Sequence, residues 1–373
     1  MRREIFSKKH DSFRTVVRRF VDEHIAPEYD LWEKNGRPSR RFWRAAGELG
    51  ILGIGVPPEH GGTPDTTFTH SVVVTEEIQR QFFAVGGLRV QTDICMSYFL
   101  HYADEQQKQR WLPKLTNGEH VAALGLSEPG SGSDLKSMST RAERVGDHYV
   151  INGAKAFISN GASADLVILA VKTDPSAGRH GISLIVVDTT LEGFERGRSL
   201  DKLGLKAQDL AELSFTNVRV PVEDRLGEEN RGFEYLMSNL AQERLSIAVN
   251  SQAAASAALD HTVELLAGTS PSQHTKFELA ACVAEIASGQ ALADRALAEL
   301  ENGTLSPADA ATTKLYCTEL QGRVVDRCLQ QLGTAGYTRE CNIGRAYLDG
   351  RVSRIYGGSS EIMKVIISQT LAL

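Results

Sequence analysis

The feature that most constrains the fold is a change of residue pattern at two points along the chain. From residue 1 to about 120, apolar residues recur at helical spacing. From about 121 to 230, short aliphatic and β-branched runs are bounded by Gly, Pro and Asp, and from 231 to 373 the pattern is helical again and rich in Ala. This order predicts an α+β multidomain protein with an N-terminal helical domain (1–120), a middle antiparallel β domain (121–230) and a C-terminal four-helix bundle (231–373).

The expected elements follow from local spacing and from residues that end helices. Pro27 ends or bends the first helix, and Asp104 is placed to cap a later one. Helices are expected at 5–21, 42–52, 72–83 and 105–115, and later at 241–267, 277–302 and 306–332. Because no helical period separates its apolar runs, the middle region predicts a mostly antiparallel sandwich or barrel. Its strands are expected at 121–126, 141–145, 148–152, 166–171, 182–187 and 213–220.

Composition excludes several classes of protein. The chain of 373 residues is 42% hydrophobic and carries a net charge of −6, which disfavours nucleic acid as a partner. No apolar run reaches membrane-spanning length and no signal peptide is expected, so we predict a cytoplasmic protein without a membrane span. The five cysteines form no Cys-x-x-Cys pair and no metal-type spacing with His. We therefore expect reduced, buried thiols and no metal site.

A loop of small residues follows the first expected strand. Residues 124–134 read LGLSEPGSGSD, in which glycines allow close approach of the backbone and serines supply donors. Such a turn suits phosphate or the edge of a planar cofactor. No Gly-x-Gly-x-x-Gly follows a strand, so a nicotinamide-type dinucleotide fold has no support.

Several strings in fixed order resemble the acyl-CoA dehydrogenase family of flavoenzymes over nearly the whole chain. The resemblance implies FAD as cofactor, an acyl thioester as substrate and an electron-transferring flavoprotein as electron acceptor. The matching strings are WLPKLTNGE (111–119), LSEPGSGSD (126–134), INGAKAFISNG (151–161), LDKLGLKAQDLAELSFTNVRVP (200–221), GEENRGF (227–233), QERL (242–245) and IYGGSSEIM (355–363).

The resemblance also implies which residues contact FAD. The matched strand and loop would lie along the flavin ring and its pyrophosphate, and they contain Leu124, Leu126, Ser127, Gly132 and Ser133. Phe157, Ile158 and Ser159 would cover another part of the ring, although plain β core is the alternative for Phe157 and Ile158. Further cofactor contacts are implied for Gln330, Gly333, Ser359 and Glu361.

The family's catalytic base has two possible places. The chemistry removes a proton from Cα and passes a hydride from Cβ to flavin N5, which requires a positioned base. Most members carry a Glu in a Tyr-Glu-Gly-Thr string, where this chain has Gly357. A group similar to the long-chain and isovaleryl enzymes places the base in a string that here reads Gln-Glu-Arg-Leu, so we predict Glu243 as the base. The alternative is a surface Glu paired with Arg244, and Glu361 is a weaker candidate for the base.

The glycine at 357 keeps a main-chain donor. In the family, the N–H at this position helps to hold the thioester oxygen, a contribution of about 3 kcal/mol for such a donor. The vacated side-chain volume favours a longer or branched acyl chain. Substrate contacts are predicted for Ser133, Arg244 and Gly358.

Two departures from the family concern its subunit contacts. The Arg-x-x-Phe-Gly string, which reaches the FAD of a neighbouring subunit, is absent where residues 265–273 read LLAGTSPSQ. In the Gln-x-x-Gly-Gly-x-Gly string, Thr334 replaces the second Gly. These departures predict an α2β2 heterotetramer with a sister dehydrogenase, and a homotetramer or homodimer remains the alternative.

The predicted reaction is FAD-dependent dehydrogenation of an acyl-CoA to the trans-2-enoyl-CoA. One alternative is a biosynthetic dehydrogenase that acts on acyl-carrier protein. The other is a partly degenerate, structural subunit of a heteromeric acyl-CoA dehydrogenase.

Overall fold

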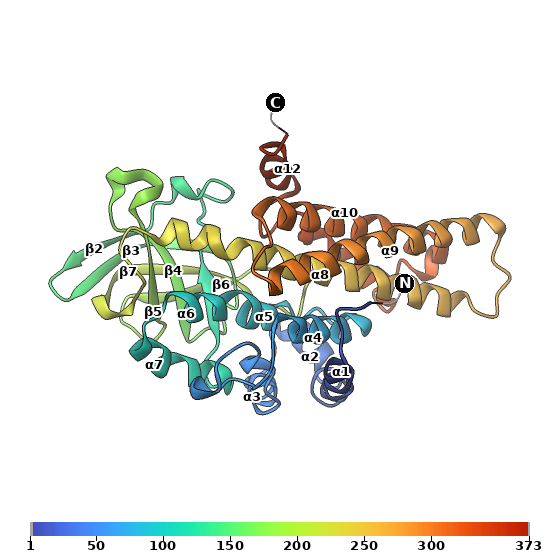
Figure 1. Cartoon of the computed structure of the whole chain (residues 1–373), viewed down its shortest axis with the longest axis horizontal. Coiled ribbons are helices and arrows are strands. Elements are labelled where there is room, and N and C mark those ends of the chain that lie inside the picture. Colours follow the sequence, from blue (N-terminus) through green and yellow to red (C-terminus); the bar gives the residue numbers. More distant parts are fainter. Residues whose placement is uncertain (1–2, 372–373) are drawn as a thin grey trace.

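The computed structural model of the protein describes residues 3–371, so two residues at each end of the chain lie outside it. Helices, a sheet and again helices follow one another in the expected order. The sheet lies at one end of an elongated molecule, and the long C-terminal helices extend to the other end (Figure 1).

Seven α-helices precede the sheet in the described chain, and the four expected ones are among them. Asp104 caps the last, since its side chain accepts a hydrogen bond from the Gln107 N–H. Two π-helical segments, Val21–Ile25 and Val90–Cys95, continue α1 and join α5 to α6. The helices are α1 (Lys8–Phe20), α2 (Tyr29–Asn35), α3 (Arg40–Glu48), α4 (Phe68–Arg80), α5 (Gly86–Arg89), α6 (Met96–Tyr102) and α7 (Glu105–Thr116); α2, α5 and α6 were not predicted.

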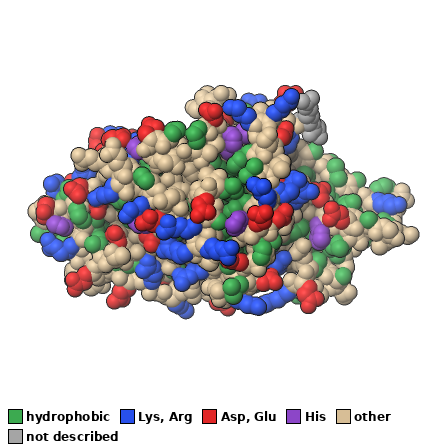
Figure 2. Space-filling model, turned by 90° about the horizontal axis from the view of Figure 1, so that it is seen from below, with side chains coloured by type: hydrophobic (Ala, Val, Ile, Leu, Met, Phe, Trp, Pro, Cys, Tyr) green, Lys and Arg blue, Asp and Glu red, His purple; other side chains and the backbone are tan. Residues whose placement is uncertain are grey.

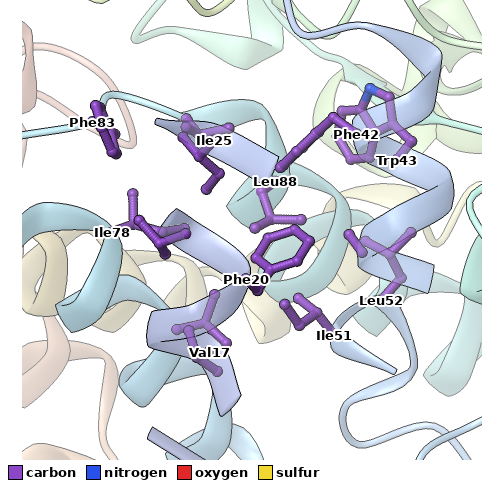
Figure 3. Close-up of a cluster of buried hydrophobic side chains, with 14 of the residues drawn as sticks. Val17, Phe20, Ile25, Phe42, Trp43, Ile51, Leu52, Ile78, Phe83 and Leu88 are labelled. Carbon is purple, nitrogen blue, oxygen red and sulfur yellow. The ribbon is translucent and has the colours of Figure 1, made fainter. Parts of the chain in front are cut away.

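One apolar cluster holds the first helices together (Figure 3). Phe20 of α1 and Phe42 of α3 lie with their ring centroids 5.9 Å apart. Ile78 contributes from α4 and Leu88 from α5. Full burial of such side chains stabilises by about 1.5–3 kcal/mol each, so this cluster holds α1, α3, α4 and α5 together.

The eight strands form one connected sheet: seven follow the order β6-β7-β3-β2-β4-β5-β8, and β1 pairs with β4 off this path. Pairing is mostly antiparallel, as predicted, but β4 pairs in parallel with both β1 and β2. Because β4 also pairs with β5, the sheet branches at β4 instead of forming two separate sheets or a closed barrel. The strands are β1 (Ala122–Gly125), β2 (Arg141–Val145), β3 (His148–Ser159), β4 (Leu166–Lys172), β5 (Ile182–Asp188), β6 (Phe194–Ser199), β7 (Leu210–Pro221) and β8 (Arg225–Leu226); β6 and β8 were not predicted.

Both faces of the central strands are buried. Leu166 and Ile168 of β4 pack with residues of α6 and α7, whereas Val167 and Leu169 pack with residues of β3 and β7. A strand that is covered on both sides has no exposed face to carry polar residues. This explains why β4 and β5 read as nearly continuous apolar runs.

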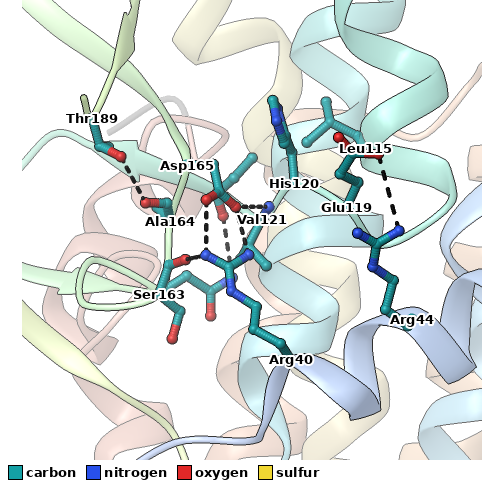
Figure 4. Close-up of polar contacts among 12 residues, drawn as sticks. Arg40, Arg44, Leu115, Glu119, His120, Val121, Ser163, Ala164, Asp165 and Thr189 are labelled. Carbon is teal, nitrogen blue, oxygen red and sulfur yellow. Dashed lines mark hydrogen bonds and ion pairs between the residues drawn. The ribbon is translucent and has the colours of Figure 1, made fainter. Parts of the chain in front are cut away.

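Polar contacts fasten the N-terminal helices to the sheet (Figure 4). The Arg40 guanidinium of α3 donates to both carboxylate oxygens of Asp165, at 2.6 and 2.8 Å, and to the Ser163 carbonyl. Asp165 also accepts from the Val121 N–H at 2.8 Å. The start of β1 is therefore fixed to the start of β4 and to α3 at one carboxylate.

The C-terminal region is built on three long helices, with two shorter helices packed against them. The long helix α8 runs from the sheet along the length of the molecule (Figure 1). The helices are α8 (Gly232–Leu266), α9 (Gln273–Glu301), α10 (Pro307–Leu332), α11 (Asn342–Gly350) and α12 (Ser360–Ser368); α11 and α12 lie beyond the three expected ranges. Within residues 3–371, no helix combines the length and apolar character that a membrane crossing requires.

All five cysteines are free thiols. Four of them are buried as expected, but Cys341 is half-buried because it lies at the start of α11, so that part of the prediction is wrong.

On the face shown in Figure 2, Lys and Arg side chains gather near the middle with Asp and Glu side chains directly beside them.

Candidate active site

Glu243 projects from α8 into the protein interior and has 6% of its surface exposed. The Tyr98 hydroxyl, on α6, donates a hydrogen bond of 2.9 Å to its Oε1. The hydrogen-bond partner of Glu243 is thus a buried tyrosine and not the neighbouring Arg244. The alternative of a surface Glu on a solvated helix face is wrong.

Burial governs the protonation of this carboxyl. Burial raises the pKa of Glu243 to about 7, although the Tyr98 hydroxyl and the positive charge of Arg244 both act to lower it. A carboxylate with a pKa near neutrality is a stronger proton acceptor than an exposed one and is still ionised in a large fraction of molecules.

Three further contacts hold the turns of α8 around Glu243 against the preceding helices. The Gln242 side-chain amide donates to the Asp93 carbonyl at 2.7 Å, and the Ser246 hydroxyl donates to the Asp93 carboxylate at 2.5 Å. One turn earlier, His101 and Asn239 are hydrogen-bonded at 3.0 Å. Asp93 lies in the π-helical segment that leads into α6. This segment and α6 therefore form hydrogen bonds with α8 both before and after Glu243.

The Gly357–Gly358 turn lies beside the same part of α8. Both glycines adopt left-handed backbone angles, with φ of +62° and +92°. A Cβ at position 357 would lie 2.2 Å from Cδ1 of Ile247, which is one turn after Glu243. The two positions at which the family carries its base therefore face the same region of this chain.

A buried lysine holds this turn. Lys314 Nζ, on α10, donates to the Gly358 carbonyl at 2.7 Å. Burial, and then the positive charge of Arg244, lower the pKa of Lys314 to about 8. Five residues along α10, Glu319 accepts a hydrogen bond of 2.6 Å from the Ser360 hydroxyl. Lys314 and Glu319 thus attach Gly358 and Ser360, respectively, to α10.

Arg244 is a second buried cation near the candidate base. Its side chain is 6% exposed, and burial lowers its pKa. Nε is enclosed and has no hydrogen-bond partner among residues 3–371. A buried guanidinium with an unused donor is suited to a carbonyl or an anionic group.

The small-residue loop after β1 is organised by an ion pair that sequence reasoning missed. Glu128 accepts from Lys155 Nζ at 2.9 Å, and Lys155 is completely buried on β3. Burial acts to raise the pKa of Glu128, but hydrogen bonds from Thr140, Lys155 and Ser139 lower it to about 2. Lys155 also donates to the Leu126 carbonyl at 3.1 Å. Glu128 and Lys155 lie within two of the matching strings, but the pairing of a loop residue with a residue of β3 gives no sequence signal.

The loop that this ion pair supports presents small residues and a main-chain donor. A Cβ at Gly130 or Gly132 would meet no atom within 4 Å, and Ser133 is exposed. Within the described chain, the Ser127 N–H has no hydrogen-bond acceptor. Leu124 and Leu126 are partly buried in the same apolar cluster as Tyr98 of α6. Because Tyr98 also contacts Glu243, α6 connects the start of the loop to the candidate base.

Phe157 is turned outward by a bulge in β3. The pairing of β3 with β7 shifts register between Lys155 and Ile158, and Phe157 takes a φ of +58°. Its ring is consequently 65% exposed, whereas Ile158 is buried among strand residues. The burial of the Ile158 side chain fits the alternative of plain β core for this residue. The Ser159 hydroxyl accepts a hydrogen bond of 2.9 Å from Gln208.

The remaining predicted cofactor residues fall in two places. Ser359 caps α12, and Glu361 lies exposed in the first turn of that helix, next to the Gly357–Gly358 turn. Gln330 and Gly333 are exposed at the end of α10, about 24 Å farther along that helix than Lys314 at 1.5 Å per residue. The fold therefore does not bring Gln330 and Gly333 together with Glu243.

A surface groove of about 580 Å³ lies over the start of α8 and is separate from the candidate base. Arg179, His180, Phe233 and Met237 contribute to its lining. Glu243 lies about two and a half helical turns after Glu234 of this groove, and therefore on the opposite face of α8. Elsewhere in residues 3–371, no group of three or more His, Cys, Asp or Glu side chains is placed to hold a metal ion.

Comparison with known proteins gives matches over the whole chain. The models for the N-terminal, middle and C-terminal domains of acyl-CoA dehydrogenase match residues 7–119, 123–218 and 230–372. The long-chain specific acyl-CoA dehydrogenase of Sus scrofa is 39% identical over 99% of this chain and 88% of its own length. The isovaleryl-CoA dehydrogenase of Pongo abelii is 33% identical over 97% of this chain and 88% of its own length. The crystal structure of an acyl-CoA dehydrogenase from Geobacillus kaustophilus has a TM-score of 0.97 at 40% identity, with full coverage of both chains.

Proposed function

The chain belongs to the acyl-CoA dehydrogenase family of flavin-dependent oxidoreductases, and we propose that it converts an acyl-CoA to the trans-2-enoyl-CoA with Glu243 as the base. The observation that carries the proposal is the buried carboxyl of Glu243, whose pKa is raised to about 7. The α proton of a thioester is weakly acidic, so its removal requires such a base at a fixed position.

The Gly357–Gly358 turn supplies the second part of the proposed mechanism. Removal of the α proton places negative charge on the thioester oxygen, and the Gly357 N–H is proposed to donate to that oxygen. The Lys314 contact to the Gly358 carbonyl holds this donor in place before substrate binds. A preorganised donor of this kind contributes about 3 kcal/mol to lowering the barrier.

The loop after β1 fits a planar, anionic cofactor. An unused Ser127 N–H, open space at Gly130 and Gly132 and the outward ring of Phe157 support a flavin nucleotide at this loop. FAD, when bound, supplies the oxidant that accepts the hydride from Cβ. We propose that this chain would hold it with Leu124, Leu126, Ser127, Gly132, Ser133, Phe157, Ser159, Ser359 and Glu361, and that Gln330 and Gly333 serve a neighbouring subunit.

The substrate side is proposed to use Arg244, Ser133 and Gly358. Arg244 offers an unused buried donor, and the absence of a side chain at 357 leaves Ile247 to line the space near the base. The similarity to the long-chain and isovaleryl enzymes supports a longer or branched acyl chain.

Substitution of the base tests the proposal. Glu243→Gln keeps the size of the side chain and removes its basicity, so we expect anaerobic flavin bleaching by acyl-CoA to slow by about 10²–10⁴-fold. Glu264→Gln is the matched control, because Glu264 lies exposed on the same helix. A panel of straight-chain and branched acyl-CoA and acyl-carrier-protein substrates assigns the carrier. If a complex with a sister subunit keeps its full rate when this chain carries Glu243→Gln, Glu243 is not the base and the chain has a structural role.

Subunit composition is tested separately. Expression of the chain alone, followed by measurement of flavin per protomer and of mass in solution, distinguishes a homomer from an α2β2 assembly. Full FAD occupancy and activity in a homomer would remove the reason for a sister subunit. Reduction of an electron-transferring flavoprotein by the enzyme tests the proposed electron acceptor.

A further inference from the structure

Tyr98 is a completely buried tyrosine whose hydroxyl contacts the candidate base. In the part of the chain that the structure describes, Oε1 of Glu243 is the hydrogen-bond partner of this hydroxyl, at 2.9 Å. Burial, and then the negative charge of Glu243, raise the pKa of Tyr98 well above its ordinary value. The hydroxyl therefore remains protonated and acts as a donor toward the carboxylate.

The position of Tyr98 relative to Glu243 is fixed by the backbone. The Asp93 carbonyl and carboxylate accept hydrogen bonds from Gln242 and Ser246, which flank Glu243 on α8. Asp93 precedes Tyr98 by little more than one turn, across the junction of the π-helical segment and α6. Movement of Tyr98 away from Glu243 would break these contacts, and the buried Asp93 carboxylate would lose its Ser246 donor at a cost of about 1–3 kcal/mol.

Other ionisable groups near Glu243 do not replace this contact. Cys95, one turn before Tyr98, is a buried thiol whose pKa is raised by burial and then by the charge of Glu243. Arg244 acts on Glu243 through its charge and forms no hydrogen bond with it in residues 3–371. Oε2 of Glu243 likewise has no donor in the described chain, which leaves that oxygen available to a proton.

We propose that Tyr98 is a positioning residue for Glu243, which it holds by one carboxylate oxygen so that the other faces the substrate. This inference rests on the proposed role of Glu243 as the base. A donor to the carboxylate also stabilises its ionised form. Tyr98 thus opposes the effect of burial and keeps a larger fraction of the base ionised near neutral pH.

The test compares the isosteric variant Tyr98→Phe with Tyr102→Phe. Tyr102 is one turn along α6, and its hydroxyl donates to the Tyr235 carbonyl at 3.4 Å instead of to Glu243. We expect Tyr98→Phe to move the acidic limb of the kcat/KM profile upward by one pH unit or more, which lowers the rate about tenfold below that limb. Tyr102→Phe leaves the limb where it is in the wild type.

A second measurement follows the base without turnover. Infrared titration of the carboxyl band that is lost in Glu243→Gln reports the protonation of Glu243 directly. The band of Tyr98→Phe should titrate at higher pH than that of the wild type. Replacement of Tyr98 by fluorotyrosine, a stronger donor of similar size, should shift the titration to lower pH, and this variant also serves if Tyr98→Phe folds poorly.

The two proposals fail in different ways. If the band and the kcat/KM limb of Tyr98→Phe coincide with those of Tyr102→Phe, the positioning role is overturned, and loss of activity in Glu243→Gln still supports the base. If Glu243→Gln retains full activity, the proposed function falls. The infrared shift then still decides whether Tyr98 controls the carboxyl.

Discussion

Ile247 lies against Gly357, so closely that a Cβ on the glycine would be 2.2 Å from Cδ1 of the isoleucine. Ile247 is one turn beyond Glu243, on the helix that carries the candidate base. The side chain that fills the space beside position 357 therefore comes from the same helix face as the carboxyl. In this chain a base at 243 and an isoleucine at 247 together occupy the region that a Glu at 357 would need.

This contact predicts the effect of a side chain at position 357. Gly357→Ala should lower the free energy of unfolding by about 1–2 kcal/mol, because its left-handed φ disfavours a Cβ, and by more if Ile247 cannot move. Ile247→Ala should remove the part of this destabilisation that comes from the contact between the new Cβ and Ile247. Urea denaturation of the two single variants and the double variant measures the coupling between the positions. Strictly additive effects would contradict the contact.

Glu243→Gln should stabilise the protein more at pH 8 than at pH 5. The pKa of Glu243 is raised to about 7 in the folded chain, so the fold favours the protonated form. The stabilisation by that form is complete below about pH 4.5 and is lost as the pH rises through about 7. Glutamine does not ionise, and we expect the difference in free energy of unfolding between variant and wild type to grow by about 1–3 kcal/mol from pH 5 to pH 8. Equal differences at both pH values would indicate that Glu243 is not held in an apolar site.

Glu128→Gln should be strongly destabilising because it leaves Lys155 buried without its counter-charge. Loss of one partner of a buried ion pair costs about 3–5 kcal/mol, and Glu128→Gln/Lys155→Met should recover part of this loss. The pKa of Glu128 is lowered to about 2, so the stabilisation is present above about pH 4.5 and is lost as the pH falls through about 2. Thermal melts at pH 7 and pH 3 check both statements. A single variant as stable as the wild type at pH 7 would contradict them.

Lys314→Met should remove a pH dependence of the free energy of unfolding between about pH 8 and pH 10.5. The pKa of Lys314 is lowered to about 8, so the stability linked to its neutral form is complete above about pH 10.5 and is lost as the pH falls through about 8. We expect the difference in free energy of unfolding between variant and wild type to change by about 1–3 kcal/mol between pH 7 and pH 10. Turnover should also fall, since the Gly358 carbonyl loses its donor. Retention of full turnover would show that Lys314 does not fix the turn.

The order of helices and strands could be predicted from the sequence because it depends on local periodicity. Asp104 was identified as a cap by the same local reasoning. β6 was missed because its residues Phe194–Ser199 are mostly exposed and polar, so no alternation marks them. The branching of the sheet at β4 depends on which strands meet, and pairing between distant strands leaves no local pattern.

The candidate site was predictable in part. Glu243 could be selected because its string matched a family motif and position 357 lacked a carboxylate. Its partner could not, because Tyr98 is 145 residues earlier and meets Glu243 only when α6 packs on α8. Lys155 and Glu128 present the same difficulty, since a charged residue in a strand reads as a solvated one until its burial is known.

The 35-residue helix α8 has a consequence for how such a protein changes over evolutionary time. At 1.5 Å per residue it is about 52 Å long, and no Gly or Pro interrupts it after its first residue. A stiff rod of this kind transmits a tilt or axial shift at its remote end to the carboxyl near its beginning. Substitutions of the small residues in the distant half of α8 would thereby alter the position of the catalytic carboxyl, and natural selection on the reaction rate would act on them. This holds even though those residues lie far from the reacting carbon.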